Sequence, residues 1–403
     1  MRLDPVTSGE PLTAGIGRVV QIAAAHADAV DREGRFPHEA VQALREEGFF
    51  GAMVPVSLGG HGATMAELAN QTQQLGRACA STAMVYAMHH SQLACIVGHG
   101  LDQEWHRAFA QRIAAEQLLL ASITSEVGIG GDTRSSICAV EAAEGRFTLV
   151  KQAPTVSYGA YADAFLVTAR AHGDAVASEQ VMVTVPREQA RMDPTGGWDT
   201  LGMRGTCSIG FQFSSEGVVD QVLPASFAEI SADAMVPVSH LLWSAAWTGI
   251  AVEALSRARQ FLRAAARRNR GVAPPGAARL VRASGEIDGL RARLVALIAQ
   301  FDACSPLTGA PRAMTPEQAG WPTGMAAGAA LNMLKLDVSE TCHEVVMDAM
   351  RICGMAGYKN GGEFSLGRQL RDIISAQLMI NNDRIAANTG TLLLAQRTDL
   401  GTI

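Results

Sequence analysis

The sequence lacks the features that mark membrane proteins, secreted proteins and nucleic-acid-binding proteins. It has no run of about eighteen apolar residues, which a membrane-spanning helix requires. Its 33 lysines and arginines are outnumbered by 39 aspartates and glutamates, and the net charge of -6 gives no basic field for nucleic acid. The first residues include Asp4 and no apolar stretch of the signal-peptide kind. We therefore expect a cytoplasmic protein without a membrane or nucleic-acid partner.

Cysteine is scarce and dispersed. The seven cysteines form no C-x-x-C pair, and an odd number argues against a disulfide framework. They are predicted to be reduced thiols in the core, as is usual in a cytosol. Because no cluster of metal ligands stands out either, no metal site is expected.

The chain does contain ample apolar material, 48% of its 403 residues, arranged in three successive patterns. Residues 1–121 and 233–403 repeat apolar residues at helical spacing. Residues 122–232 instead form short runs of Val, Thr, Phe and Ile that are cut by Gly, Pro and Asp, as in β-strands. This order predicts an α+β protein with an N-terminal α-helical domain, a central antiparallel β domain and a C-terminal helical domain.

More detailed predictions concern the last domain. Four helices are expected there, at residues 240–270, 277–301, 326–352 and 365–394. Residues 304–325, rich in Pro and Gly, are expected to be a connection.

Three short segments combine glycines and polar side chains: residues 124–132, 197–208 and 351–358. Glycine lets backbone N–H groups approach a ligand closely, and hydroxyls can donate to a polar ring edge. Each segment also has an ordinary interpretation: a plain turn, a hairpin with a buried Trp198, and a helix C-cap at Gly354. One segment alone therefore decides little about function.

Together, the three segments resemble the acyl-CoA dehydrogenase family. T-S-E-V-G-I-G-G-D at 124–132 is similar to the family's T-E-P-G-x-G-S-D loop, with one residue inserted or shifted. Residues 198–208 are similar to W-x-x-x-G-M-R-G-T-x-S, and residues 354–358 to G-G-x-G-[YF]. Arg371 and Asp372 match the family's R-D, and residues 54–62 its loop V-P-E-x-x-G-G-x-G. The resemblance spans about residues 30 to 395.

The resemblance implies the fold, the cofactor and the assembly. It implies a C-terminal four-helix bundle, FAD as cofactor, and a homo-oligomer, either a dimer or a tetramer. Thr124, Ser125, Gly130 and Gly131 would line the flavin ring, and Ser157 would place a hydroxyl near flavin N5. The tryptophan that usually shields the ring two residues earlier is Thr155 here, so one face of the flavin would be more open.

Four further residues are implied to bind the cofactor. Arg267 matches the Arg of R-x-x-F-G, which meets the FAD pyrophosphate, although the Phe of that pattern is Arg270 here. Arg351 replaces a Gln that contacts FAD across a subunit boundary, and Gly354 begins the glycine turn. Asn382 lies near the position of a Thr that contacts the nucleotide part.

The family's catalytic glutamate is missing from both of its known positions. Nine residues past Arg371 lies Ile380, and the alternative position in the first C-terminal helix is Ser239. Two replacement bases are considered: His240, beside Trp243 and Trp247, and Asp383, one helical turn past the usual position. Each also has a structural interpretation, as a hydrogen-bonded histidine at a helix start and as a cap or partner of Arg384. His89 and His90 are expected to have a core or interface role.

Three functional hypotheses remain open. The favoured one is α,β-dehydrogenation of an acyl thioester of CoA or of an acyl carrier protein, with hydride transfer to flavin N5 and an electron-accepting flavoprotein as partner. The second is a flavin-dependent monooxygenase on the same scaffold, which uses O2 and reduced flavin from a partner reductase. The missing carboxylate and the missing tryptophan suit the second hypothesis. The third is a flavin-binding or assembly subunit without catalysis.

Overall fold

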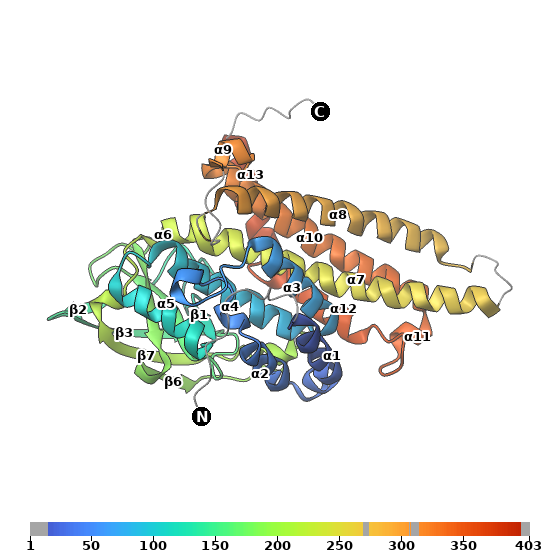
Figure 1. The fold of residues 1–403 in the computed structure, drawn as a ribbon, viewed down its shortest axis with the longest axis horizontal. Coiled ribbons are helices and arrows are strands. Elements are labelled where there is room, and N and C mark those ends of the chain that lie inside the picture. Colours follow the sequence, from blue (N-terminus) through green and yellow to red (C-terminus); the bar gives the residue numbers. More distant parts are fainter. Residues whose placement is uncertain (1–14, 269–273, 306, 308–313, 396–403) are drawn as a thin grey trace.

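A computed structural model describes residues 15–268, 274–305, 307 and 314–395, which form a helical, a β-rich and a second helical part (Figure 1). The first part contains five α-helices: α1 Ile16–Glu33, α2 His38–Glu46, α3 Met65–Ala78, α4 Ala80–His99 and α5 Glu104–Glu116. Helix α3 begins with a capping box in which Thr64 and Glu67 bind each other's backbone N–H groups. Helix α4 is buried on nearly all sides, and its polar side chains, His89 and His90 among them, are buried together with its apolar ones.

The central part consists of two sheets. The strands are β1 Leu120–Ile123, β2 Glu141–Ala143, β3 Arg146–Ala153, β4 Ala164–Arg170, β5 Gln180–Pro186, β6 Ala190–Pro194 and β7 Phe211–Val218. One sheet has the order β1-β4-β5 and the other β2-β3-β7-β6. The pairings are antiparallel as expected, except that β1 runs parallel to β4, with Leu120 opposite Ala164. The exception arises because the chain crosses to the second sheet after β1 and returns to β4 in the same direction.

The last part is a bundle of long helices. It contains α6 Phe227–Ile230, α7 Val236–Arg268, α8 Ala277–Cys304, α9 Pro316–Ala319, α10 Gly324–Cys353, α11 Met355–Tyr358, α12 Gly367–Leu378 and α13 Asn382–Ala395. In Figure 1, α7, α8 and α10 run side by side away from the sheets. The family-like fold of helical, β and helical bundle parts is therefore confirmed.

Most of the expected elements are confirmed, and one is wrong. The first three predicted bundle helices correspond to α7, α8 and α10, and α9 occupies part of the expected connection. The single helix expected at 365–394 is instead broken between Leu378 and Asn382. Ile380 and Asn381 adopt left-handed φ angles of 56° and 45°, which end one helix and redirect the chain into the next.

Helix α7 is the core element that joins the parts. Its first half is buried, and two glycines let it cross α3 closely: a Cβ on Gly249 would meet the Gln73 carbonyl at 2.4 Å, and one on Gly76 would meet the Ala246 carbonyl at 2.4 Å. The helix from Phe227 to Arg268 is apolar enough to span a bilayer by composition alone, but 83% of its most apolar window is buried inside the protein. Its apolar surface is therefore used for internal packing.

Candidate functional site

The structure brings together two of the three sequence segments and adds the turn after β3. Ser125 Oγ donates to the Thr155 carbonyl at 2.7 Å. On the other side of the turn, Val156 N–H donates to the Ile209 carbonyl at 2.9 Å and Tyr158 N–H to the Thr206 carbonyl at 2.7 Å. Residues 124–127, 155–158 and 203–209 thus form one wall at the edge of the β domain.

A chain of hydroxyls runs along this wall. Thr206 Oγ1 donates to the Met203 carbonyl at 2.9 Å and lies 2.8 Å from Ser208 Oγ. Ser208 Oγ in turn lies 2.9 Å from Ser157 Oγ. Ser157 ends this series of hydroxyls and keeps hydrogen-bonding capacity for a ligand, and its proximity to flavin N5 stays a prediction.

The wall also concentrates unusual backbone geometry. Tyr158, Met203 and Cys207 have φ angles of 43°, 52° and 44°, in the left-handed region that side chains other than glycine rarely adopt. Tyr158 is held there by its buried ring and by its hydroxyl, which donates to the Leu120 carbonyl at 2.9 Å. Such strain persists only where the surrounding structure enforces it, and it concentrates at functional sites.

The glycine-rich loop at 124–132 is fixed at one end by a buried carboxylate. Glu126 accepts from the N–H groups of Ile137 and Cys138 at 3.0 and 2.7 Å. The fully buried Lys151 lies 3.6 Å from Glu126 and donates to the Thr168 carbonyl at 2.6 Å. Burial lowers the pKa of Lys151. Gly130 and Gly131, by contrast, lie exposed with φ of 58° and 78°, and nothing would meet a Cβ on Gly130.

The C-terminal helices close the other side of this loop. Arg384, in the first turn of α13, donates to the Gly130 carbonyl. Met203 N–H donates to Asp372 of α12 at 2.7 Å, and a Cβ on Gly202 would meet the Arg371 carbonyl at 2.0 Å. The turn between α12 and α13 therefore faces the glycine-rich loop across the same site.

That turn is where the family carries its catalytic glutamate, and no carboxylate replaces it inside. Ile380 is 42% exposed. Asp383 is exposed, and its backbone N–H donates to Asn381 Oδ1 at 3.0 Å. Asn382 points back to α10, where it accepts from Lys335 and donates to Ser339 at 3.1 Å. Its proximity to a nucleotide remains a prediction.

His240 lies inside the protein, at the start of α7. Its ring stacks on Trp243 at 5.7 Å, and burial, followed by the charge of Lys335, lowers its pKa to about 4. Ser239 Oγ donates to the Val236 carbonyl at 3.1 Å and lies 3.4 Å from His240 Nδ1. The Ser239 oxygen is then left to accept the Nδ1–H, which makes Nε2 an acceptor.

Around His240, α7 and α10 share a cluster of buried polar groups, here called the polar seam. It consists of His240, Trp243, Ser244, Trp247 and Thr248 of α7 with Lys335 and Ser339 of α10. Lys335 Nζ lies 5.8 Å from the centre of the Trp247 ring. Within the described part of the chain, five seam atoms have no hydrogen-bond partner: His240 Nε2, Trp243 Nε1, Ser244 Oγ, Trp247 Nε1 and Thr248 Oγ1. Buried polar atoms are nearly always paired, so these five atoms require partners such as water or a polar ligand.

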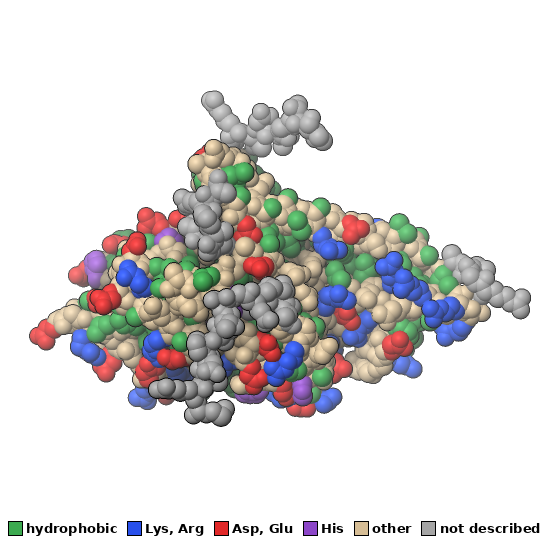
Figure 2. Space-filling view, viewed as in Figure 1, with side chains coloured by type: hydrophobic (Ala, Val, Ile, Leu, Met, Phe, Trp, Pro, Cys, Tyr) green, Lys and Arg blue, Asp and Glu red, His purple; other side chains and the backbone are tan. Residues whose placement is uncertain are grey.

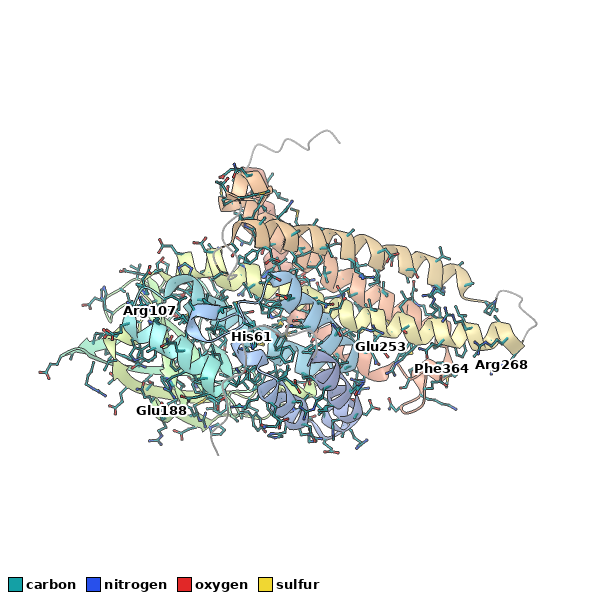
Figure 3. All side chains as sticks on the ribbon, in the orientation of Figure 1. His61, Arg107, Glu188, Glu253, Arg268 and Phe364 are labelled. Carbon is teal, nitrogen blue, oxygen red and sulfur yellow. The ribbon has the colours of Figure 1, made fainter. Side chains whose placement is uncertain are left out.

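Two predicted cofactor residues lie far from this site within one chain. Arg267 is exposed in the last turn of α7, and Figure 3 places the adjacent Arg268 at the opposite end of the molecule from Glu188 of the β domain. Arg351 pairs with the buried Asp348 at 3.1 Å. Gly354, with φ of 55°, follows α10 as its C-cap.

His89 has the core role that its apolar helix predicted. Its Nδ1 accepts the Leu120 N–H at 3.1 Å, so its Nε2 donates to the Phe50 carbonyl at 2.8 Å. Burial lowers the pKa of His89 to about 4. No disulfide joins the cysteines that the structure describes, and the described residues hold no group of three or more His, Cys, Asp or Glu that could bind a metal.

Sequence reasoning missed Lys335 and Arg384 as site residues. Lys335 had a signal that could have identified it, because it is a lysine within an apolar stretch of a helix and such lysines are rarely buried without a role. Arg384 had none, since only the broken helix brings it to Gly130.

The residues present suit a flavin. The exposed glycines of the loop leave room for close approach, and Ser157, Thr124 and backbone N–H groups supply the donors that a polar ring edge requires. The polar seam is linked to that site through α13, where Asn382 accepts from Lys335 and Arg384 donates to the Gly130 carbonyl. A flavin and a polar second ligand could therefore meet here.

The chain is similar to known protein families and to individual known proteins. Residues 18–117 match the acyl-CoA dehydrogenase N-terminal domain, and residues 238–380 match the acyl-CoA dehydrogenase C-terminal domain. Amino sugar nitrososynthase DnmZ of Streptomyces peucetius is 30% identical over 357 residues, which cover 87% of this chain and 84% of that protein.

Two solved structures share the fold. FMN-bound TdsC from Paenibacillus sp. A11-2 superposes with a TM-score of 0.81 at 19% identity and covers 97% of this chain and 99% of its own. KijD3 in complex with FMN and dTDP-3-amino-2,3,6-trideoxy-4-keto-3-methyl-D-glucose has a TM-score of 0.78 at 22% identity and covers 98% of this chain and 96% of its own.

Proposed function

The chain belongs to the acyl-CoA dehydrogenase family, and we propose that it acts within this family as a flavin-dependent monooxygenase on the amine of an amino sugar. The observation that carries the proposal is the absence of a buried carboxylate at both family positions for the catalytic base, where the chain has Ile380 and Ser239. Dehydrogenation needs a carboxylate to take the acidic C–H proton, whereas oxygenation of an amine does not. The similarity to an amino sugar nitrososynthase supports the amine as substrate.

In this proposed reaction, different residues of the chain would have different roles. Thr124, Ser125, Ser157 and the glycines 130 and 131 would hold the flavin, with Arg384 keeping the loop closed. A bound flavin, reduced by a partner reductase, would supply the two electrons for the reaction with O2, in which one oxygen atom would be transferred to the amine nitrogen and the other would leave as water. His240 Nε2 would accept an N–H hydrogen bond from the amine and so aim the nitrogen lone pair at the oxygen.

The proposal predicts a defined product. Purified flavoprotein, a flavin reductase, NADH and O2 would convert dTDP-3-amino-2,3,6-trideoxy-4-keto-3-methyl-D-glucose, the sugar bound by KijD3, into an N-oxidised sugar. Mass spectrometry would show the gain of oxygen, and 18O2 would label the product. Unchanged sugar in the presence of reduced flavin and O2 would refute an N-oxygenase for this substrate class.

Dehydrogenation of an acyl thioester is the second candidate, favoured by family membership. An anaerobic titration with acyl-CoA thioesters separates the two functions, because a dehydrogenase bleaches its flavin band without added reductant. Under the N-oxygenase proposal the band stays unchanged for every thioester. Release and chromatography of the cofactor in the same preparation would distinguish FAD, the predicted form, from FMN.

His240 offers a direct test of the site. We expect His240→Ala to lower the N-oxygenation turnover at least tenfold, because the amine loses its buried acceptor. Since the pKa of His240 is about 4, the wild-type rate should show no titration of this histidine between about pH 6 and pH 9. The neighbouring Ser239→Ala is the matched control with a smaller loss. Equal rates for His240→Ala and wild type would remove His240 from the mechanism.

A further inference from the structure

The polar seam between α7 and α10 combines three groups that can only donate hydrogen bonds with hydroxyls that both donate and accept. Each indole N–H can only donate, and the Lys335 ammonium carries donors and no acceptor. The Lys335 ammonium donates to Asn382 Oδ1, and no carboxylate forms an ion pair with it among the residues that the structure describes. His240 Nε2 is the one neutral ring acceptor that the seam offers, as its hydrogen bonding indicates.

We propose that the polar seam binds the substrate amine as its uncharged free base and that Lys335 excludes the protonated ammonium form. The proposal rests on the N-oxygenase function and adds the protonation state that the site accepts. A free amine can donate to His240 Nε2 and accept from an indole N–H or from Lys335. An ammonium could only donate, and its charge would meet that of Lys335 in a buried setting where like charges repel strongly.

The Trp247 ring strengthens this selection. The face of a tryptophan attracts cations, and an aromatic pair such as Trp243 and Trp247 could otherwise hold an ammonium. In this protein Lys335 Nζ already lies 5.8 Å from the Trp247 ring centre. The cation site over that ring is therefore filled by the protein's own side chain. The selected form is also the reactive one, because only a free amine has the lone pair that oxygen attacks.

The other charged groups around Lys335 do not reverse its effect. From α7, His240 faces it, and this ring stays neutral. On α10 itself, the Glu340 carboxylate raises the pKa of Lys335, but less than burial lowers it, and Glu340 accepts a hydrogen bond from Asn382 at 3.1 Å. From α13, Asp383 is exposed.

The remaining neighbours on the packed helices are occupied elsewhere. Asp337 of α10 pairs with Arg293 of α8 at 2.9 Å, and His343 of α10 meets Gln377 of α12 at 3.3 Å. Burial lowers the pKa of Lys335 to about 8, so the lysine is cationic in the range where the substrate amine is protonated and becomes neutral above it.

The test is equilibrium binding to the oxidised, flavin-loaded protein without reductant, so that no turnover occurs. The probes are dTDP-3-amino-2,3,6-trideoxy-4-keto-3-methyl-D-glucose and the same nucleotide sugar with a hydroxyl in place of the amine. For wild type we expect the amine's Kd, relative to the hydroxyl analogue, to weaken at least fivefold from about pH 8.5 to about pH 6.5. In Lys335→Met the weakening should fall below twofold, because the Trp247 ring is then free to take the ammonium. Lys335→Arg keeps the positive charge, so its relative Kd for the amine should weaken between these two pH values as much as in wild type.

Every outcome decides between the proposals. If the amine binds equally well or better at low pH in wild type, or if Lys335→Met keeps the full slope, the seam does not select the free base, even when N-oxygenation itself is observed. If the amino sugar binds at neither pH and yields no oxidised product, the amino sugar function fails together with the inference. Should Lys335→Met not fold, as judged by circular dichroism and flavin content, Lys335→Gln replaces it with the same expected loss of slope.

Discussion

At the scale of single residues, Asp372 shows how burial and site construction are linked. Its carboxylate accepts the Met203 N–H at 2.7 Å and so holds the strained segment that carries Thr206 and Ser208. The side chain is buried, and burial raises its pKa to about 6 although Arg368 and Arg371 act in the opposite direction. The protein therefore keeps a carboxylate in a place where ionisation is costly.

Asp372→Asn should remove a pH dependence from the stability. Because the folded pKa is raised from 3.8 to about 6, the folded state binds the extra proton between these values, and the stability contribution of Asp372 falls as pH rises through them. The unfolding free energy of the Asp372→Asn variant, minus that of wild type, should rise by about 2 kcal/mol from about pH 4 to about pH 7. Urea unfolding at several pH values measures it. A difference that does not change with pH would show that Asp372 does not titrate in this way.

At the scale of elements, the site is an assembly of loops fixed by buried charges and turns. The glycine-rich loop depends on Glu126 and the fully buried Lys151 beneath it. The α12–α13 turn depends on Asn382 and Lys335 above it. Both anchors are polar groups inside apolar surroundings, so each is expected to be sensitive to the loss of one partner.

Lys151→Met should destabilise the protein and weaken flavin binding. The methionine fills the volume but leaves Glu126 buried without its cation, at a cost of about 3–5 kcal/mol in unfolding free energy. Flavin affinity should fall at least tenfold, because the loop loses its anchor. Adding Glu126→Gln to Lys151→Met removes the unpaired charge and should restore a large part of the stability. If the double variant is no more stable than Lys151→Met, the ion pair is not what holds the loop.

Ile380→Asn should stabilise the α12–α13 turn. A β-branched side chain at φ of 56° is strained, and asparagine tolerates this region better. Ile380 is exposed, so little buried contact is lost, and we expect a gain of about 1 kcal/mol in unfolding free energy. Leu378→Asn, at an exposed helical position beside the turn, is the control and should give no gain. Equal effects of the two changes would contradict strain at Ile380.

The sequence predicted elements better than their junctions. Helical and strand periodicities located α7, α8, α10 and the long strands, because one buried face repeats along each of them. The break at Ile380 could not be predicted, because neither Ile380 nor Asn381 is a glycine or a proline, the residues that indicate the end of a helix. Ser157 was selected from its resemblance to a family segment. The contacts of Lys335 and Arg384 join elements that are distant in sequence, so a local pattern could not predict them.

At the scale of the whole molecule, the cofactor residues predicted from sequence lie in two separate places. The hydroxyls and glycines lie at the β domain, while Arg267 and Arg351 lie in the last turns of α7 and α10, and Figure 3 shows Arg268 far from the β domain. Figure 2 shows Lys and Arg side chains gathered toward the end where α7 finishes and α8 begins. A single chain does not bring both sets together, which fits the predicted homo-oligomer in which a second copy would supply the arginines.

Mixed oligomers would test this arrangement. Arg267→Glu with Arg351→Glu should lose flavin through repulsion of the phosphate, and Ser157→Phe should lose it by filling the ring side. When the two variants are refolded together, mixed pairs contain one intact site, so flavin should return to a fraction of the sites. Native mass spectrometry counts the mixed pairs, and flavin absorbance counts the occupied sites. Mixed pairs without flavin would mean that the far arginines do not serve a partner's site.

The contact between Arg384 and Gly130 joins positions 254 residues apart in the chain. A ribosome must therefore synthesise α13 before the glycine-rich loop gains the side chain that closes it. The β domain can fold while synthesis continues, but its loop waits for α13. The closed form of the loop that would hold the cofactor is accordingly not available before α13 has been synthesised.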